Sequence, residues 1–121
     1  MTQQKIHLGQ KGEDMAVSFL KEKGYEIRER NVRGARGEID IIARDQDTIC
    51  FIEVKTRSSD AMGMPAEAVS FQKQKKLAYL AMKYIQSNRL EDSRMRFDVV
   101  SVLLTNKGAP EIEVIKNAFE V

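Results

Sequence analysis

The order of apolar and polar positions along the chain predicts two helices and five strands. Apolar residues recur every three or four positions over residues 9–23, where Gly24 is placed to end a helix, and again over residues 66–87. The other apolar segments alternate or are rich in β-branched residues, as strands are. The predicted elements are a helix over 9–23, strands over 25–33, 38–44 and 48–56, a loop over 58–65, a helix over 66–87, and strands over 95–104 and 111–116.

This order, αβββαββ, predicts an α/β fold with a central mixed β-sheet of about five strands flanked by helices. The connection between the third and fourth strands contains the second helix, so it can serve as a crossover between parallel strands. A chain of 121 residues suits one hydrophobic core, and we expect a single domain over residues 1–121.

The second and third strands are predicted to form an antiparallel hairpin with one apolar face. The link at residues 46–47 has the length of a tight hairpin loop. Because side chains alternate along a strand, each strand divides its residues between two faces. One face of the hairpin is then formed by Ile39, Ile41, Ala43, Cys50, Ile52 and Val54.

The opposite face of this hairpin carries three acids and a lysine. Counting outward from the loop places Asp40 opposite Glu53, and the same register sets Glu38 across from Lys55. Opposed carboxylates repel each other, and a hard ion such as Mg²⁺, which prefers oxygen ligands, would relieve the repulsion. Lys55 would steady a developing negative charge beside them. The alternative is that these charges are the solvated face of a half-buried sheet.

An acid on the first helix favours the metal interpretation. Glu13 stands at helical spacing from the apolar residues that follow it, so it lies on or beside the apolar face. A carboxylate there must be paired, coordinated or at the rim of the core. If the helix packs beside the hairpin, Glu13 points at the cluster of Asp40 and Glu53.

Composition narrows the class of protein only slightly. Twenty Lys and Arg against 18 Asp and Glu leave a net charge of +2, so only the placement of charge could indicate a partner. The single cysteine and the absence of an apolar leader indicate a reducing, cytoplasmic location. No apolar run approaches the roughly 18 residues that would suggest a membrane span.

Basic residues flank the acidic hairpin and would suit DNA phosphates. Lys73 and Gln74 border the buried side of the second helix and would reach the same cleft, or else lie at the helix edge with their heads in water. The arginines, each of which has the alternative of an ordinary surface charge, are Arg28, Arg30, Arg33, Arg36 and Arg57.

Two short motifs resemble the PD-(D/E)XK nuclease superfamily: "EID" at residues 38–40 and "EVK" at residues 53–55. A longer set of strings spans nearly the whole chain and resembles the YraN-like family of small bacterial proteins, which is similar to archaeal Holliday-junction resolvases and restriction-endonuclease cores. These strings are "GEDMAVSFLKEKGYEI", "GEIDIIARD", "FIEVKTRS", "GMPAEAV", "KQKKL" and "RFDVV".

The resemblance implies a restriction-endonuclease-like core and a Mg²⁺-dependent (or Mn²⁺-dependent) endonuclease that hydrolyses phosphodiester bonds in DNA. It implies Asp40, Glu53 and the Val54 backbone carbonyl as metal ligands, and Lys55 as the catalytic lysine. Glu13 resembles the helix acid of the resolvase-like branch. The pattern departs from the superfamily at Ile39, which stands where the name-giving proline would be. That departure weakens the transfer of a particular substrate, such as branched DNA.

Two further function classes remain open at this stage. One is a non-catalytic nucleic-acid-binding module that retains the nuclease fold. The other is a scaffold whose acids are merely exposed. A homodimer would suit a resolvase, because such an enzyme cuts two strands and this chain offers one site.

Overall fold

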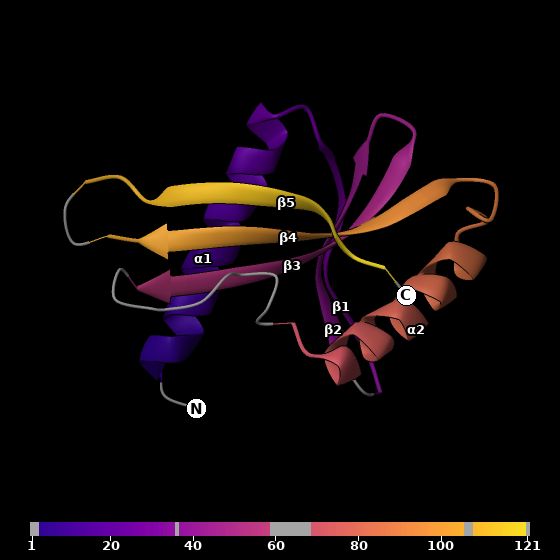
Figure 1. Cartoon of the computed structure of the whole chain (residues 1–121), viewed down its shortest axis with the longest axis horizontal. Helices are drawn as coiled ribbons and strands as arrows, with labels where there is room; N and C mark the ends of the chain where they lie inside the picture. The colour runs from indigo at the N-terminus through magenta and orange to yellow at the C-terminus, as the bar shows by residue number, and fades with distance from the viewer. Residues whose placement is uncertain (1–2, 36, 59–68, 106–107, 121) are drawn as a thin grey trace.

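The computed structural model describes residues 3–35, 37–58, 69–105 and 108–120, with the backbone alone described for residues 3–8. The predicted order of elements is confirmed (Figure 1). The elements are α1 (Gln3–Glu22), β1 (Glu26–Gly34), β2 (Gly37–Asp45), β3 (Thr48–Ser58), α2 (Phe71–Ser87), β4 (Arg94–Leu104) and β5 (Glu111–Phe119).

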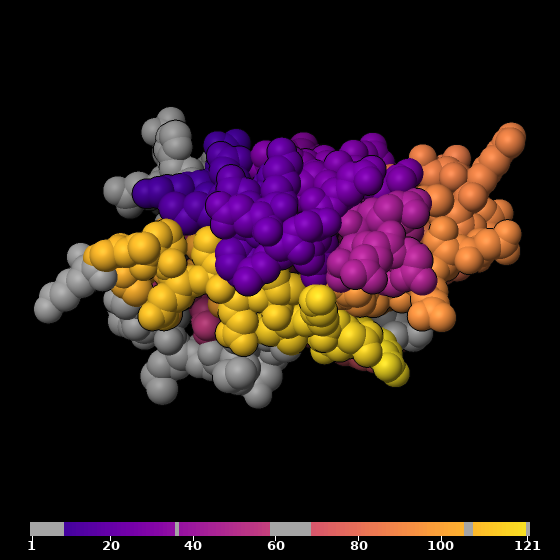
Figure 2. All heavy atoms as spheres, turned by 90° about the horizontal axis from the view of Figure 1, so that it is seen from above, coloured from indigo at the N-terminus to yellow at the C-terminus, as the bar shows by residue number. Residues whose placement is uncertain are grey.

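The five strands form one mixed sheet in the order β1-β2-β3-β4-β5. Neighbouring strands are antiparallel except β3 and β4, which are parallel and are connected through α2, as predicted. The helices α1 and α2 cover opposite faces of the sheet (Figure 1). The edge strand β5 lies at the surface beside α1 (Figure 2). Within the described ranges, neither helix is long and apolar enough to cross a membrane.

Each helix packs on its own hydrophobic core. The α1-side core contains Ala16, Val17, Leu20, Tyr25, Ile41, Ala43, Cys50, Ile52, Val100 and Val102. The α2-side core contains Ile39, Ile42, Ile49, Phe51, Val69, Leu77, Leu80, Ala81, Tyr84, Ile85, Phe97 and Val99. The prediction that Ile39 shares a face with Ile41 is wrong, because the two lie in different cores and the alternation of β2 is interrupted between them.

Local end signals, a glycine and a capping serine, mark the helix ends better than the spacing of apolar residues does. Helix α1 begins at Gln3, ahead of the predicted residue 9, and ends before Gly24, whose φ of 93° favours glycine. Helix α2 begins at Phe71 because the Ser70 hydroxyl accepts the Lys73 N–H at 3.2 Å and caps the first turn.

The predicted boundaries before α2 need correction. The second helix was expected from residue 66, but Val69 and Ser70 are not helical, and residues 66–68 lie outside the described residues. The predicted loop over 58–65 also falls outside them, except for Ser58, which is the last residue of β3. An N-capping serine thus marked the helix start better than the periodicity of apolar residues.

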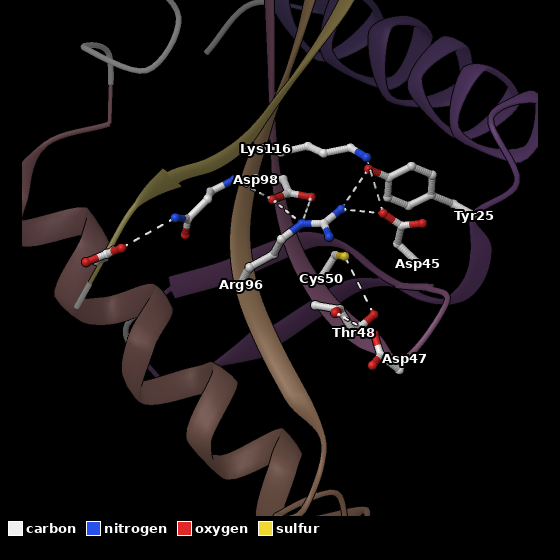
Figure 3. Close-up of polar contacts among 10 residues, drawn as sticks. Tyr25, Asp45, Asp47, Thr48, Cys50, Arg96, Asp98 and Lys116 are labelled. Carbon is white, nitrogen blue, oxygen red and sulfur yellow. Dashed lines mark hydrogen bonds and ion pairs between the residues drawn. The ribbon is translucent and has the colours of Figure 1, made fainter.

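A largely buried network of ion pairs and hydrogen bonds connects the strands at the end of the sheet where β2 finishes, at Asp45 (Figure 3). Arg96 Nε donates to both oxygens of Asp98, each at 3.0 Å, and Asp98 is fully buried. Arg96 Nη2 also donates to Asp45 at 2.7 Å and to the Tyr25 hydroxyl at 2.9 Å. The backbone N–H of Asn117 completes the shell of Asp98 at 2.9 Å. The network therefore joins β4 to β2, β5 and the segment before β1.

Candidate metal centre

The pairing of β2 with β3 ends near the middle of β3. The predicted register is confirmed from Asp45–Thr48 up to Ile41–Ile52, which is the last pair between these strands. Beyond it β3 continues to Ser58 alongside β4, whereas β2 stays with β1. The two strands therefore diverge, and we call this point the fork (Figure 1).

Asp40 occupies the first position of β2 beyond the last pair at the fork. Its Oδ2 accepts a hydrogen bond from the Val54 backbone N–H at 2.8 Å. The side chain thus satisfies a backbone donor that the diverging β2 backbone does not reach. This bond fixes the Asp40 carboxylate beside β3, next to Glu53, as the extended register predicted.

Glu38 does not lie opposite Lys55, so this part of the prediction is wrong. Glu38 is in register with Arg33 of β1, and its Oε2 is 3.3 Å from Arg33 Nε. The physical reason is the fork, because β2 has already left β3 at this point. Only two of the three hairpin acids therefore meet Lys55.

A hollow of about 480 Å³ opens at the fork. Three elements contribute to it, with α1 forming one wall and the two diverging strands the others. Its lining residues are Gly9, Glu13, Asp40, Glu53, Val54, Lys55 and Thr56. The structure thus brings together the four side chains and the Val54 backbone for which the sequence predicted metal binding or catalysis.

The charge state of Asp40 is set by its surroundings. Burial and the nearby negative charge of Glu53 raise the pKa of Asp40 to about 7, against the opposing hydrogen bond from the Val54 N–H. The negative charge of Glu13 adds to the rise. A carboxyl group with such a pKa readily exchanges its proton for a cation at neutral pH, the proton passing to water, because a cation favours the charged form.

Two lysines neutralise Glu53, whose side chain is only 5% exposed. Lys73 of α2 donates to Glu53 Oε1, and Lys55 Nζ lies 3.7 Å from the same oxygen. Burial acts against the charge of Lys73, but the hydrogen bond and charge of Glu53 outweigh it, so the pKa of Lys73 is raised. Burial and the neighbouring charge of Lys73 lower the pKa of Lys55. The two lysines therefore differ, with Lys73 the firmer partner of Glu53.

The second oxygen of Glu53 makes the case for a cation. Glu53 Oε2 is buried, and no group of the described residues donates a hydrogen bond to it. A buried carboxylate oxygen is normally paired or coordinated, so this oxygen is available as a ligand. Among the described residues no three His, Cys, Asp or Glu side chains form a ready cage. Two carboxylates with room for water suit Mg²⁺, which keeps several waters.

Glu13 reaches the hollow from α1 but already has a partner. Its Oε1 is 3.3 Å from Arg30 Nη2, which also donates to Asp14 at 2.7 Å. The sequence left open whether this acid would be paired, coordinated or at the rim. It is paired and also lines the hollow. Helix α1 can lie this close to β3 because Gly12 has no Cβ, which would otherwise clash with Thr56.

The residues predicted to contact DNA lie in several places. Arg33 is exposed beside Glu38, away from the hollow, and Arg36 lies outside the described residues. Arg57 follows Lys55 on β3 and is partly buried. Gln74 Nε2 donates to the Val69 carbonyl at 3.0 Å, so it holds the chain just before α2.

Two other arginines of the predicted basic group are engaged within the protein. Arg30 binds the acids of α1, and Arg28 Nε donates to the Tyr84 hydroxyl at 2.9 Å. Lys73 agrees with one of its two predicted alternatives, because it reaches the cleft and contacts the predicted metal ligand Glu53 itself. Its position at the buried edge of an amphipathic helix was the only signal in the sequence.

The fold and the hollow define a small α/β protein with two carboxylates and a lysine at a fork in a mixed sheet. Comparison with known proteins gives the family. A family model described as "Uncharacterised protein family UPF0102" matches residues 12–102. The chain therefore belongs to the UPF0102 family, which confirms the resemblance to the YraN-like proteins.

Individual relatives agree with this assignment. The chain is 49% identical over 118 residues to a UPF0102 protein of Syntrophus aciditrophicus, covering 98% of this chain and 92% of that protein. It is 53% identical over 116 residues to one of Acetivibrio thermocellus, covering 92% and 89%. A Rhodococcus opacus relative is 44% identical over 114 residues, covering 94% and 97%.

Proposed function

We propose that this protein is a Mg²⁺-dependent endonuclease that hydrolyses phosphodiester bonds in DNA. The observation that carries the proposal is the meeting of Asp40, Glu53 and Lys55 around one hollow at the fork. A buried acid beside a half-buried acid is unfavourable for folding alone, and their placement has a chemical use if a divalent cation binds there. The resemblance of "EID" and "EVK" to nuclease motifs supports the same chemistry.

The residues around the hollow would bind the ion in different ways. Asp40 and Glu53 Oε2 would be side-chain ligands, and the Val54 carbonyl would be a further one. Glu13 faces the same hollow and would complete the shell, directly or through one of the waters that Mg²⁺ keeps. When bound, the ion would lower the pKa of a water molecule and polarise the scissile phosphate.

Lys55 is placed to act on the reacting phosphate. It lines the hollow from β3, close to Glu53. Its partner in the sheet is Ser101 of β4, and it has no partner on β2. Its lowered pKa, caused by burial and by Lys73, weakens its hold on a proton. Lys55 would therefore orient the attacking water or offset negative charge in the transition state.

A specific contact supports one alternative, a binding module without turnover. Lys73 already neutralises Glu53, so the fork could be held together without an ion. In that case Asp40 would keep its proton in about half of the molecules near neutral pH, and the hollow would serve only to shape a binding surface. The two proposals differ in whether a metal ion binds.

The test combines metal binding with DNA cleavage. Calorimetric titration with Mn²⁺ should show binding to the wild type and strong weakening in Asp40→Asn. Cleavage of supercoiled plasmid and of a four-way junction should fall by about 100-fold or more in Lys55→Ala, as expected for loss of a group that assists proton transfer.

Matched controls come from the same hairpin and from α1. Glu38→Gln removes a carboxylate that lies outside the hollow, and Lys21→Ala removes an exposed lysine at the end of α1. Both should bind Mn²⁺ and cut DNA as the wild type does. Binding of Mn²⁺ without cleavage of either substrate would contradict the endonuclease proposal, and absence of Mn²⁺ binding would sink the metal centre itself.

A further inference from the structure

The outward face of α2 carries large apolar side chains in water. Phe71 is 69% exposed, Tyr79 63% and Met82 47%, and these are the large exposed hydrophobic residues of the described part of the chain. None belongs to the core under α2, which is formed by other positions of the helix. An aromatic ring left in water on a small protein indicates a binding surface when its neighbours are suited to one ligand.

The neighbours of these rings are lysines. Lys75 Nζ lies 4.6 Å from the centre of the Phe71 ring, and Lys83 Nζ lies 5.5 Å from that of Tyr79. Over its whole length α2 has four lysines and neither Asp nor Glu. We call the set Phe71, Lys75, Tyr79, Met82 and Lys83 the α2 stripe. Apolar rings alternate in it with positive charges that no acid of the helix offsets.

The spacing of the stripe follows the helix. Phe71, Lys75, Tyr79 and Lys83 are four residues apart and so lie on one face, with the two rings separated by a rise of about 12 Å. Next to the second ring is a hollow of about 450 Å³, lined by Ala35, Lys75, Lys76, Tyr79 and Leu80. The stripe thus offers ring faces, a recess beside one ring, and ammonium groups between them.

The α2 stripe is continuous with the candidate metal centre. A smaller hollow of about 240 Å³ shares Lys76 with the recess beside Tyr79, and it also contains Lys73. Lys73 in turn contacts Glu53 in the metal centre. Lysine side chains therefore line a path from the fork, around the first turn of α2, to the aromatic rings, with Glu38 at the edge of the smaller hollow.

We propose that the α2 stripe binds a single strand of nucleic acid, with bases stacked on Phe71 and Tyr79 and phosphates against the lysines. Aromatic rings interleaved with cations are the usual means of binding unpaired strands, because every base has a face that can stack. Within a duplex those faces are covered by neighbouring bases. This inference rests on the proposed function for two points, that the bound strand leads to a cleavage site and that the substrate has an unpaired segment.

A second copy of the chain fits the stripe less well. In a symmetric dimer the same surface would face itself, so the lysines of one helix would lie against those of the other. Like charges brought together without acids are unfavourable. A polyanion has no such conflict, and its phosphates complement the charge of α2.

The test uses a reporter that the protein does not contain. The chain has no tryptophan, so Tyr79→Trp introduces a sole indole in the stripe. Titration with an oligothymidylate of about 12 nucleotides should quench its emission, because a stacked base quenches indole fluorescence. The titration is done in EDTA, where no cleavage occurs. A duplex of equal length should quench much less, and Phe71→Trp should behave as Tyr79→Trp does.

A matched control lies on α1. Phe19 also has a lysine over its ring, with Lys23 Nζ at 5.3 Å, but it belongs to α1, which covers the opposite face of the sheet (Figure 1), and it lines a hollow with Asp14 and Glu22. Emission from Phe19→Trp should not change with the oligonucleotide. In anisotropy measurements Tyr79→Ala should weaken binding by about 10-fold. Lys75→Gln should lower the slope of log affinity against log salt by about 0.7.

Several results would overturn the proposal. They are an unchanged emission from Trp at position 79, equal quenching at position 19, or no binding of oligonucleotide by the wild type. Sedimentation showing a dimer that Tyr79→Ala dissolves would assign the stripe to a second copy instead. Asp40→Asn combined with Tyr79→Trp should retain full quenching, so loss of the candidate metal centre alone would leave this inference standing.

Discussion

Lys73 of α2 donates a hydrogen bond to Glu53 Oε1 of β3, so a helix supplies the cation for the most buried acid of the candidate metal centre. The ion pair links α2 to the sheet at the fork. It also leaves Glu53 Oε2 as the oxygen to which no described residue donates. The two oxygens of one carboxylate are thereby divided between an internal cation and a proposed external one.

Lys73→Met should make stability depend more strongly on divalent ions. In EDTA the variant has only Lys55 to neutralise the buried Glu53 carboxylate. We therefore expect the free energy of unfolding to fall by about 1–3 kcal/mol. An ion bound at Glu53 would replace part of the missing charge, so Mg²⁺ should stabilise the variant more than the wild type. Thermal melts with and without Mg²⁺ measure this. Equal stabilisation of both proteins would contradict it.

Asp40→Asn should stabilise the protein at high pH but not at low pH. Asp40 ionises near 3.8 in the unfolded chain and at about 7 in the folded protein, so between these values the folded state holds the extra proton. Stability therefore falls as pH rises through this range, and the loss is complete above about 7. In EDTA at pH 8, Asp40→Asn should be more stable than the wild type by about 1–3 kcal/mol.

At pH 4 the same variant should match the wild type, because Asp40 is then largely protonated in the folded protein. Denaturant unfolding at the two pH values measures the difference. Glu38→Gln is the control, since its carboxylate lies outside the hollow. A gain in stability that is the same at both pH values would show that the burial of Asp40 is not its source.

Arg96→Leu should be among the most destabilising changes at a charged position. It leaves the fully buried Asp98 without its cation, and removal of one partner of a buried pair costs about 3–5 kcal/mol. Arg94→Leu is the matched control, because Arg94 is 81% exposed and lies 4.0 Å from Asp47. It should change stability by less than about 0.5 kcal/mol. Urea unfolding of both variants distinguishes a structural network from surface charge.

Gly12→Ala should destabilise the protein although alanine favours helices. A Cβ at this position would lie 2.9 Å from Cβ and Cγ2 of Thr56 and closer still to Oγ1, so α1 would have to move from β3. We expect a loss of about 1–3 kcal/mol. Gly9→Ala, one turn earlier with nothing within 4 Å, should instead gain about 0.5–1 kcal/mol. Opposite signs in calorimetric melting would confirm the close approach.

The sequence predicted the order of elements and the hairpin register because both depend on local features. Loop length alone set the pairing of Asp45 with Thr48. The fork could not be predicted in this way, because it depends on how two hairpin strands twist apart after packing on different helices. That is why Asp40 was placed correctly beside Glu53 while Glu38 was not.

The helices were predicted less completely than the strands. The partnership of Lys73 with Glu53 arises from the docking of α2 on the sheet, which the periodicity of α2 does not determine. Likewise the hydrogen bond from Arg28 to Tyr84 depends on tertiary packing. Arginines that the sequence predicted to contact DNA therefore bind groups within the protein instead. Charge placement was therefore the least predictable part of the site.

The fork also gives the candidate site a mechanical property. Asp40 belongs to the arm formed by β1 and β2, and Glu53 to the arm formed by β3, β4 and β5. The two arms share the ladder that ends at Ile41–Ile52, and just beyond it the hydrogen bond from the Val54 N–H to Asp40 bridges them. Substitutions remote from the hollow that change the twist of either arm would therefore act on the separation of the two acids through this one hydrogen bond.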